Sequence, residues 1–184
     1  MDTTFYTANE LKKLGLKSYG SNVLISKKAS IYEPYKLKVG NNVRIDDFCI
    51  ISGNITIGSY VHISAYVGLY GSAGIEIGDF SGISPRCTVF SVSDDFSGEF
   101  LIGPMIPGNY TNVKQGLVKL KNYVQIGAGC IILPSVTIGE GTVTGAMSLI
   151  NKDLDEWKTY AGIPCKVIKE RKKDMLQYVK NLNL

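Results

Sequence analysis

Aliphatic residues recur at every sixth position over most of this chain. The series occupies Val39, Ile45, Ile51, Ile57, Ile63 and Leu69, then Ile77, Ile83 and Val89, and finally Leu120, Ile126, Ile132, Ile138, Thr144 (the one polar member) and Ile150. A period of six matches neither an α-helix, at 3.6 residues per turn, nor one long strand with alternating faces. It predicts short extended segments joined by sharp corners, so that three segments make one triangular coil of about 18 residues.

A second set of positions follows these anchors by four residues and carries small or β-branched side chains. The set is Val43, Cys49, Ile55, Val61, Val67, Ala73, Ser81, Cys87, Val124, Cys130, Val136, Thr142 and Ser148. We expect the large anchors to fill the interior of each coil and the smaller residues to fit its corners. A glycine commonly follows the anchor, as in Ile57-Gly58 and Ile126-Gly127, and we expect it to supply unusual backbone angles. Glycine and β-branched residues at this density exclude a helix.

The pattern resembles that of the hexapeptide-repeat acyltransferases, over roughly residues 39–170 and less regularly from Val23 onward. The resemblance implies an all-β fold: a left-handed parallel β-helix with a long inserted loop, a short N-terminal helix and a C-terminal helix. The left-handed sense comes from the resemblance alone, because general topology favours right-handed crossovers. Coils would stack at strand spacing, about 4.8 Å apart.

We expect three segments along the chain. An N-terminal helical cap covers 1–22, the β-helix covers 23–152 with an inserted loop at 91–118, and a C-terminal segment with a helix covers 153–184. Thr7-Ala8-Asn9-Glu10 is a capping box that begins the first helix. The second helix is expected over about 167–182. Both would protect the open edges of the end coils.

Composition and charge narrow the function. The N-terminus has no basic region followed by an apolar stretch, and no apolar run approaches the roughly 18 residues of a membrane span, so we expect a cytoplasmic protein. The four cysteines show no CxxC spacing, which favours buried apolar roles in a reducing compartment. Residues 164–184 hold six basic and two acidic side chains, a net +4 that accounts for the whole charge of the chain. This basic segment predicts an anionic partner; a phosphate-bearing cofactor fits better than nucleic acid, for which no motif is present.

Aromatic residues also follow the anchors, by three positions, at Phe48, Tyr60, Tyr66, Phe80 and Tyr123. We expect them to form outward columns that are buried in a subunit contact, with scattered surface tyrosines as the alternative. The resemblance implies a homotrimer with sites between neighbouring prisms.

The repeat is interrupted by an acidic loop, and a long loop in a regular scaffold is usually functional. Resembling enzymes carry a histidine general base in a stretch reading Tyr-Thr-Ala-Gly-His-Pro-Leu, where this chain has Asp94. A second histidine of close relatives is replaced by Tyr123. A sugar hydroxyl benefits from such a base, whereas an unprotonated amine needs only a carboxylate to orient it and accept its proton. The missing histidines therefore favour an amino-sugar acceptor.

The candidate catalytic residues are Asp94 and, second, Glu99; Ser84, Asp95 and Tyr123 are candidate contacts of the acceptor. The loop pattern resembles that of nucleotide-linked 4-amino-4,6-dideoxy-sugar N-acyltransferases. The same acids could instead form a solvated loop. The one histidine, His62, should point outward, in a structural, interface or catalytic role.

The donor implied by the resemblance is acetyl-CoA, or a longer acyl-CoA, with no metal. Its pantetheine arm would lie along small residues and its phosphates would need cations and amide donors. The matching positions are Gly127, Ala128, Ala146 and Ser148 for the arm, Pro164 in the Gly-x-Pro-x-Lys segment, and Lys152, Lys166, Lys169 and Arg171 for the phosphates.

The leading hypothesis is a homotrimeric N-acyltransferase that moves an acetyl group from CoA to a nucleotide-linked amino sugar in surface-polysaccharide synthesis. A sugar or galactoside O-acetyltransferase is the first alternative, and a non-catalytic β-helix scaffold is the second. A γ-type carbonic anhydrase is excluded because it needs three histidines around zinc.

Overall fold

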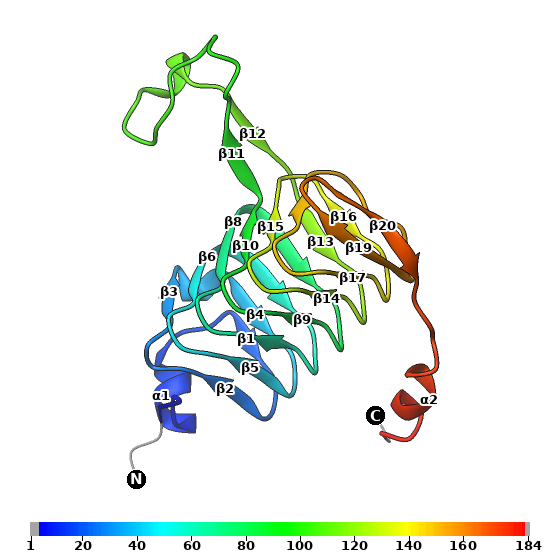
Figure 1. Ribbon diagram of the computed structural model, residues 1–184. Helices are drawn as coiled ribbons and strands as arrows, with labels where there is room; N and C mark the ends of the chain where they lie inside the picture. Colours follow the sequence, from blue (N-terminus) through cyan, green and yellow to red (C-terminus); the bar gives the residue numbers. More distant parts are fainter. Residues whose placement is uncertain (1–3, 183–184) are drawn as a thin grey trace.

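The computed structural model describes residues 4–182 and shows stacked coils of a parallel β-helix, with an arm projecting from one corner (Figure 1). Residues 1–3 and 183–184, at the ends of the two expected terminal segments, lie outside the described part. One side of the prism is a sheet that we call sheet 1. Its strands are β2 (Val23–Ile25), β5 (Val43–Ile45), β7 (His62–Ile63), β9 (Gly82–Ile83), β14 (Gln125–Ile126), β17 (Val143–Thr144), β19 (Lys158–Gly162) and β20 (Cys165–Glu170).

The other two sides are joined into a second sheet, because two long strands bend around the corner between them. These are β6 (Ile50–Ile57) and β8 (Gly68–Ile77). Their neighbours are β1 (Ser18–Tyr19), β3 (Ser30–Tyr32), β4 (Leu37–Val39), β10 (Thr88–Phe90), β13 (Val118–Leu120), β15 (Ile131–Ile132), β16 (Thr137–Ile138) and β18 (Leu149–Ile150). Pairs in this sheet are parallel, as the six-residue period requires.

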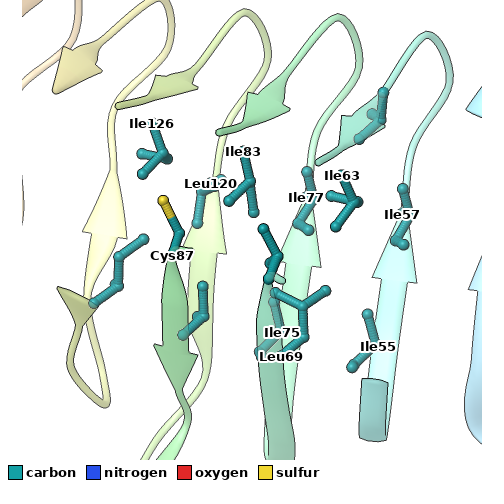
Figure 2. Packing of buried hydrophobic residues seen from close by; sticks show 14 of the residues in the cluster. Ile55, Ile57, Ile63, Leu69, Ile75, Ile77, Ile83, Cys87, Leu120 and Ile126 are labelled. Atoms are coloured by element: carbon teal, nitrogen blue, oxygen red, sulfur yellow. The ribbon is translucent and has the colours of Figure 1, made fainter. Parts of the chain in front are cut away.

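The core confirms the anchor positions, which point into the prism and stack coil upon coil (Figure 2). All fifteen anchors are at most 4% exposed. The positions four residues later are buried as well, except Ala73. The two-residue slip in the sequence is a bulge in β8, after which Ile75, not Ala73, aligns with Ile55. The four cysteines are free and at most 2% exposed, so their expected role as buried apolar residues is confirmed.

The corners differ from the expectation. Left-handed backbone angles belong mainly to the position three residues after an anchor, which the aromatic residues share: φ is 61° at Phe48, 60° at Tyr60 and 56° at Phe80. The strain of that conformation, about 1–2 kcal/mol per residue, is offset by stacking, since the Tyr60 and Phe80 ring centroids lie 4.7 Å apart. Glycines after the anchors serve another purpose. A Cβ at Gly127 would approach the Ala146 backbone nitrogen to 2.6 Å, so glycine there allows close stacking of coils.

The inserted loop forms the arm. It leaves the prism after β10 as an antiparallel hairpin of β11 (Val92–Asp94) and β12 (Val113–Gln115), with a 3₁₀ turn, η2 (Gly108–Tyr110), in its distal part. The coil then resumes with β13, which pairs with β8 as though no residues intervened.

The two ends are closed differently. Helix α1 (Ala8–Lys13) has the expected capping box between Thr7 and Glu10, and a 3₁₀ turn, η1 (Pro34–Lys36), follows in the first coils. The C-terminal helix, α2, covers only Leu176–Val179. The expected extent of 167–182 is wrong, because residues 165–170 instead form β20, which pairs antiparallel with β19. That pairing covers the free edge of β19.

Candidate functional site

One corner of the prism carries the small residues of the predicted donor site, Gly127, Ala128 and Ala146. We call it corner 1; it follows the strands of sheet 1 and comprises residues 46–48, 64–66, 84–86, 127–129 and 145–147. Ser84 lies beside Gly127 on the adjacent coil, and its backbone N–H donates to the Ile126 carbonyl at 3.0 Å. The structure therefore places a candidate acceptor contact next to the start of the candidate donor strip.

The strip itself is made of small residues whose backbone is close to the surface. Ala128 and Ala146 are exposed, and the Met147 N–H donates to the Ala128 carbonyl at 2.8 Å. Ser148 is different, since it is 2% exposed; its hydroxyl donates to the Gly145 carbonyl and accepts from the Gly162 N–H. Ser148 thus fixes the strip from beneath and offers no group at the surface.

The basic candidates are spread over the end of the prism. Lys166 lies beside corner 1, because it pairs with Ala161, whereas Lys169 pairs with Thr159 at the opposite end of that side. The turn between β19 and β20 contains a cis Ile163-Pro164 peptide bond, and Lys166 and Lys169 are exposed on β20. Lys152 is exposed after β18, at the corner that carries the arm and next to Asn151. A cleft of about 540 Å³ is lined by Lys169 and Lys172 together with Val143 and Thr159.

The predicted acids lie at another corner, at the base of the arm. Asp94 lines a cleft of about 630 Å³ together with Ser93, Lys114 and Asn151. Hydrophobic walls are contributed by Phe96, Leu133 and Pro134. Glu99 is exposed farther along the arm and is absent from this lining. Of the two candidate catalytic acids, only Asp94 therefore faces a ligand-sized space.

Asp95 turns away from that cleft. It is 6% exposed; its Oδ1 accepts the Ser97 N–H at 2.8 Å, and its Oδ2 accepts the Asn112 amide at 2.7 Å. These hydrogen bonds, first from Ser97 and then from Asn112, lower the pKa of the Asp95 carboxyl. Asp95 joins the two limbs of the arm at its base.

The remaining acceptor candidate, Tyr123, lies at a third corner. Its ring is stacked between Phe80, at 5.4 Å, and Trp157, at 6.2 Å. The Arg171 guanidinium donates to the carbonyls of Tyr123, at 2.9 Å, and Gly141, at 2.7 Å. Burial lowers the pKa of Arg171. Arg171 is thereby held by backbone carbonyls, although it is half-buried and also lines the cleft beside Lys169.

Asp94 and Ser84 do not meet within one chain. They leave the prism at corners separated by one side, whose strand is β10. A side of about six residues, at about 3.3 Å each, holds the two corners roughly 20 Å apart.

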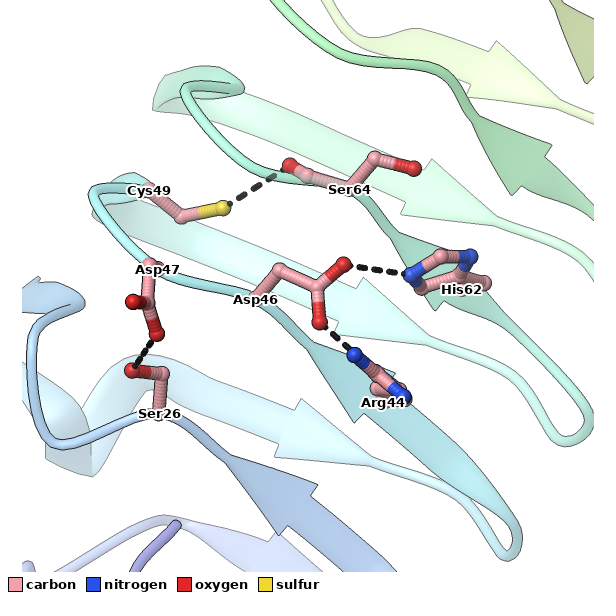
Figure 3. A network of polar contacts seen from close by, with 7 residues as sticks. All are labelled: Ser26, Arg44, Asp46, Asp47, Cys49, His62 and Ser64. Atoms are coloured by element: carbon pink, nitrogen blue, oxygen red, sulfur yellow. Dashed lines mark hydrogen bonds and ion pairs between the residues drawn. The ribbon is translucent and has the colours of Figure 1, made fainter. Parts of the chain in front are cut away.

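His62 belongs to a polar network on the outer face of sheet 1 (Figure 3). Its Nε2 lies 2.7 Å from Asp46 Oδ2, and Arg44 Nε donates to Asp46 Oδ1 at 2.6 Å. Burial opposes ionisation of Asp46, but the hydrogen bonds from Arg44 and His62 outweigh it and lower its pKa. The expected outward direction of His62 is confirmed.

Sequence reasoning missed Gln125. Its amide nitrogen lies 3.4 Å from the Ser84 hydroxyl oxygen, although 41 residues separate the two. Asn112 was missed for the same reason. No local motif marks either residue, because each contact depends on coil register or on the fold of the arm.

Two further observations concern residues 4–182. No three histidine, cysteine, aspartate or glutamate side chains gather there as a metal site would require. None of the helices has the length and apolar character needed to cross a membrane.

Comparison with known proteins defines the relationships. The model of the family described as bacterial transferase hexapeptide (six repeats) matches residues 36–71 and 118–152. A dTDP-4-amino-4,6-dideoxy-D-glucose acyltransferase of Escherichia coli is 42% identical, over 91% of this chain and 89% of the relative. The galactoside O-acetyltransferase of E. coli K12 is 28% identical, over 79% of this chain and 70% of its own length.

A solved structure is nearer still. AntD, an N-acyltransferase from Bacillus cereus in complex with dTDP and 3-hydroxybutyryl-CoA, is 54% identical and covers 100% of both chains with a TM-score of 0.96. Other AntD structures carry the substitutions S84C, S84T, S84A, D94N and D94A in its own numbering, and this chain has serine and aspartate at those numbers. The chain belongs to the hexapeptide-repeat acyltransferases with a left-handed β-helix, in the group that contains these N-acyltransferases of nucleotide-linked amino sugars.

Proposed function

We propose that this protein transfers an acyl group from acyl-CoA to the 4-amino group of a dTDP-linked 4-amino-4,6-dideoxy sugar. The observation that carries the proposal is the presence of a cleft with one free carboxylate, Asp94, in a chain 54% identical to a protein complexed with dTDP and an acyl-CoA. The acyl group is acetyl or a longer chain such as 3-hydroxybutyryl.

The reaction needs few protein groups. The unprotonated amine attacks the thioester carbonyl carbon, the C–S bond breaks, and CoA leaves as the thiolate. Asp94 orients the amine and accepts the proton that the nitrogen loses as the tetrahedral intermediate collapses. Ser84 hydrogen-bonds the substrate beside the thioester, and a backbone N–H of the Gly127-Ala128 strip polarises its carbonyl. Glu99 is a second acid on the arm. Tyr123 supports the site indirectly through the aromatic stack with Phe80 and Trp157, and Asp95 does so by holding the base of the arm together.

The separation of Asp94 from Ser84 supports a homotrimer. A neighbouring prism could bring its corner 1 to the arm of the first chain, so that each site takes Asp94 from one subunit and Ser84 from another. The arm suits such a contact, because Phe96 is 78% and Met105 91% exposed. The outward aromatic columns, including the Phe48–Tyr66 pair with centroids 4.9 Å apart, would be covered as well.

The donor would run along corner 1 toward the basic C-terminal segment. Lys152, Lys166 and Lys169 are exposed and free to approach the phosphates of CoA, with Pro164 shaping the turn between β19 and β20. Arg171 contributes by fixing this segment to the prism. A cytoplasmic location, where acyl-CoA and nucleotide sugars are made, and a role in surface-polysaccharide synthesis complete the proposal.

The test is a pH–rate profile of the wild type and D94N with acyl-CoA and dTDP-4-amino-4,6-dideoxyglucose, with the product identified by mass. We expect an amide product, and we expect D94N to lose most activity at neutral pH but recover part of it at high pH, where the amine is deprotonated without help. D174N, which makes the same change at an exposed aspartate outside the cleft, is the matched control. An ester product, or loss of D94N activity equally at every pH, would support the O-acetyltransferase alternative instead.

A further inference from the structure

We infer that Gln125 is a positioning residue that makes the Ser84 hydroxyl a hydrogen-bond donor toward an oxygen atom of the substrate. The inference rests on the proposed function for its catalytic meaning, but the contact itself can be tested without turnover. It assigns a role to the outer face of sheet 1 at the point where that face meets corner 1.

The geometry begins with register. Gln125 on β14 is paired with Gly82 on β9, so the two residues lie side by side on adjacent coils. A Cβ at Gly82 would lie 2.5 Å from Gln125 Oε1 and 3.0 Å from Nε2. The carboxamide therefore folds back over Gly82 and occupies the space that any other residue would fill.

This fold-back directs the amide toward Ser84, two residues beyond Gly82. Gln125 Nε2 donates to Ser84 Oγ at 3.4 Å, the one side-chain contact of that hydroxyl among residues 4–182. The contact is long for a hydrogen bond.

The chemical consequence follows from the donor and acceptor inventory. An amide N–H can only donate, so Ser84 Oγ accepts from Gln125 and its own hydrogen points elsewhere. Ser84 is half-buried at corner 1, beside Gly127, and its free hydrogen is available to an oxygen such as the thioester carbonyl. Without the amide, the hydroxyl could rotate and would donate in that direction only part of the time.

The first test measures the contact directly in the S84C variant. The four native cysteines are at most 2% exposed, so the new thiol should dominate alkylation of the folded protein by iodoacetamide. An amide N–H that donates to sulfur stabilises the thiolate. We expect Q125L to raise the thiol pKa, read from the alkylation rate against pH, by roughly half to one unit. The control is Q177L, which removes an exposed glutamine from α2.

The second test is a double-mutant cycle on turnover. Q125L should lower kcat by roughly tenfold with the KM of both substrates little changed, and G82A, which displaces the same amide, should resemble it. In the S84A background, Q125L should have no further effect, because its partner is gone. A merely structural role would give equal losses in both backgrounds.

The outcomes distinguish failure of the role of Gln125 from failure of the proposed function. An unchanged thiol pKa in S84C/Q125L, or additive losses in the cycle, overturns the role of Gln125 even if the wild type acylates the amino sugar well. A wild type that acylates no nucleotide-linked amine overturns the proposed function. The thiol measurement then still decides whether Gln125 donates to residue 84.

Discussion

Replacing Arg171 with methionine should destabilise the protein without removing a phosphate contact. The Arg171 guanidinium donates to the carbonyls of Tyr123 and Gly141, and its backbone N–H donates to the Trp157 carbonyl at 2.8 Å. One residue thus joins three successive coils at a single corner. R171M leaves the backbone bond but removes both guanidinium bonds to carbonyls, together with the weaker contact of a guanidinium nitrogen with Met175 Sδ at 3.3 Å.

The magnitude can be worked from those two bonds. Hydrogen bonds from a charged group are worth about 1.5–3 kcal/mol each, so the pair sets an upper value of about 6 kcal/mol. Water can reach part of this half-buried site, and we therefore expect a loss of about 3 kcal/mol. At about 2–4 °C per kcal/mol for a chain of this size, Tm should fall by about 6–12 °C. The Tm of R171K should lie between those of R171M and the wild type, since the lysine ammonium lacks the planar fork of the guanidinium.

The assay is thermal unfolding with and without CoA. K172M, which changes the adjacent exposed lysine, is the control and should leave Tm within about 1 °C of the wild type. The ratio of affinities for CoA and 3′-dephospho-CoA should be the same in R171M and the wild type. A normal Tm combined with a selective loss of CoA affinity would refute the reasoning and restore Arg171 as a phosphate ligand.

Two more predictions concern stability. G141A should lower the free energy of unfolding in urea by several kcal/mol, because Gly141 has φ +65° and a Cβ there would meet the Trp157 ring at 2.5 Å. The control is G15A, since Gly15 has φ +75° with open space around it and measures the backbone cost alone, about 1–2 kcal/mol. Equal losses in the two variants would contradict the packing argument. Hydrogen bonds from Lys27, and then from the capping box, lower the pKa of Glu10 from 4.5 to about 2. A carboxyl whose pKa is lowered in the folded protein stabilises the fold at pH values above its ordinary pKa. The stability difference between the wild type and E10Q should therefore be full at pH 6 and vanish as the pH falls from about 4.5 through about 2. A difference independent of pH would contradict this prediction.

The coil was predictable because its chemistry is periodic. Burial of an aliphatic side chain at every sixth residue leaves a strong signal, and anchors such as Ile63 and Ile126 are buried as the sequence indicates. The bulge in β8 was visible in the sequence as a two-residue slip, but the sequence did not indicate that Ile75 would take the buried place expected for Ala73. The end of the chain was misjudged because Val167 and Ile168 fit a helical stripe and a strand equally well, and the open edge of sheet 1 decides between them.

The site was predictable only in part. Asp94 was found by its place in a family motif, and no local feature distinguished it from Asp95, which turns into the arm. Arg171 looked like one cation among several, because its carbonyl partners lie 48 and 30 residues away. Long-range hydrogen bonds of this kind depend on the final geometry of the corners and leave no pattern along the chain.

The arm enters and leaves the prism between β10 and β13 without altering the register of either strand with its neighbours. Its length and composition are therefore uncoupled from the folding of the coils. An arm of another length or sequence could therefore replace this one without disturbing the pairing of the strands on either side.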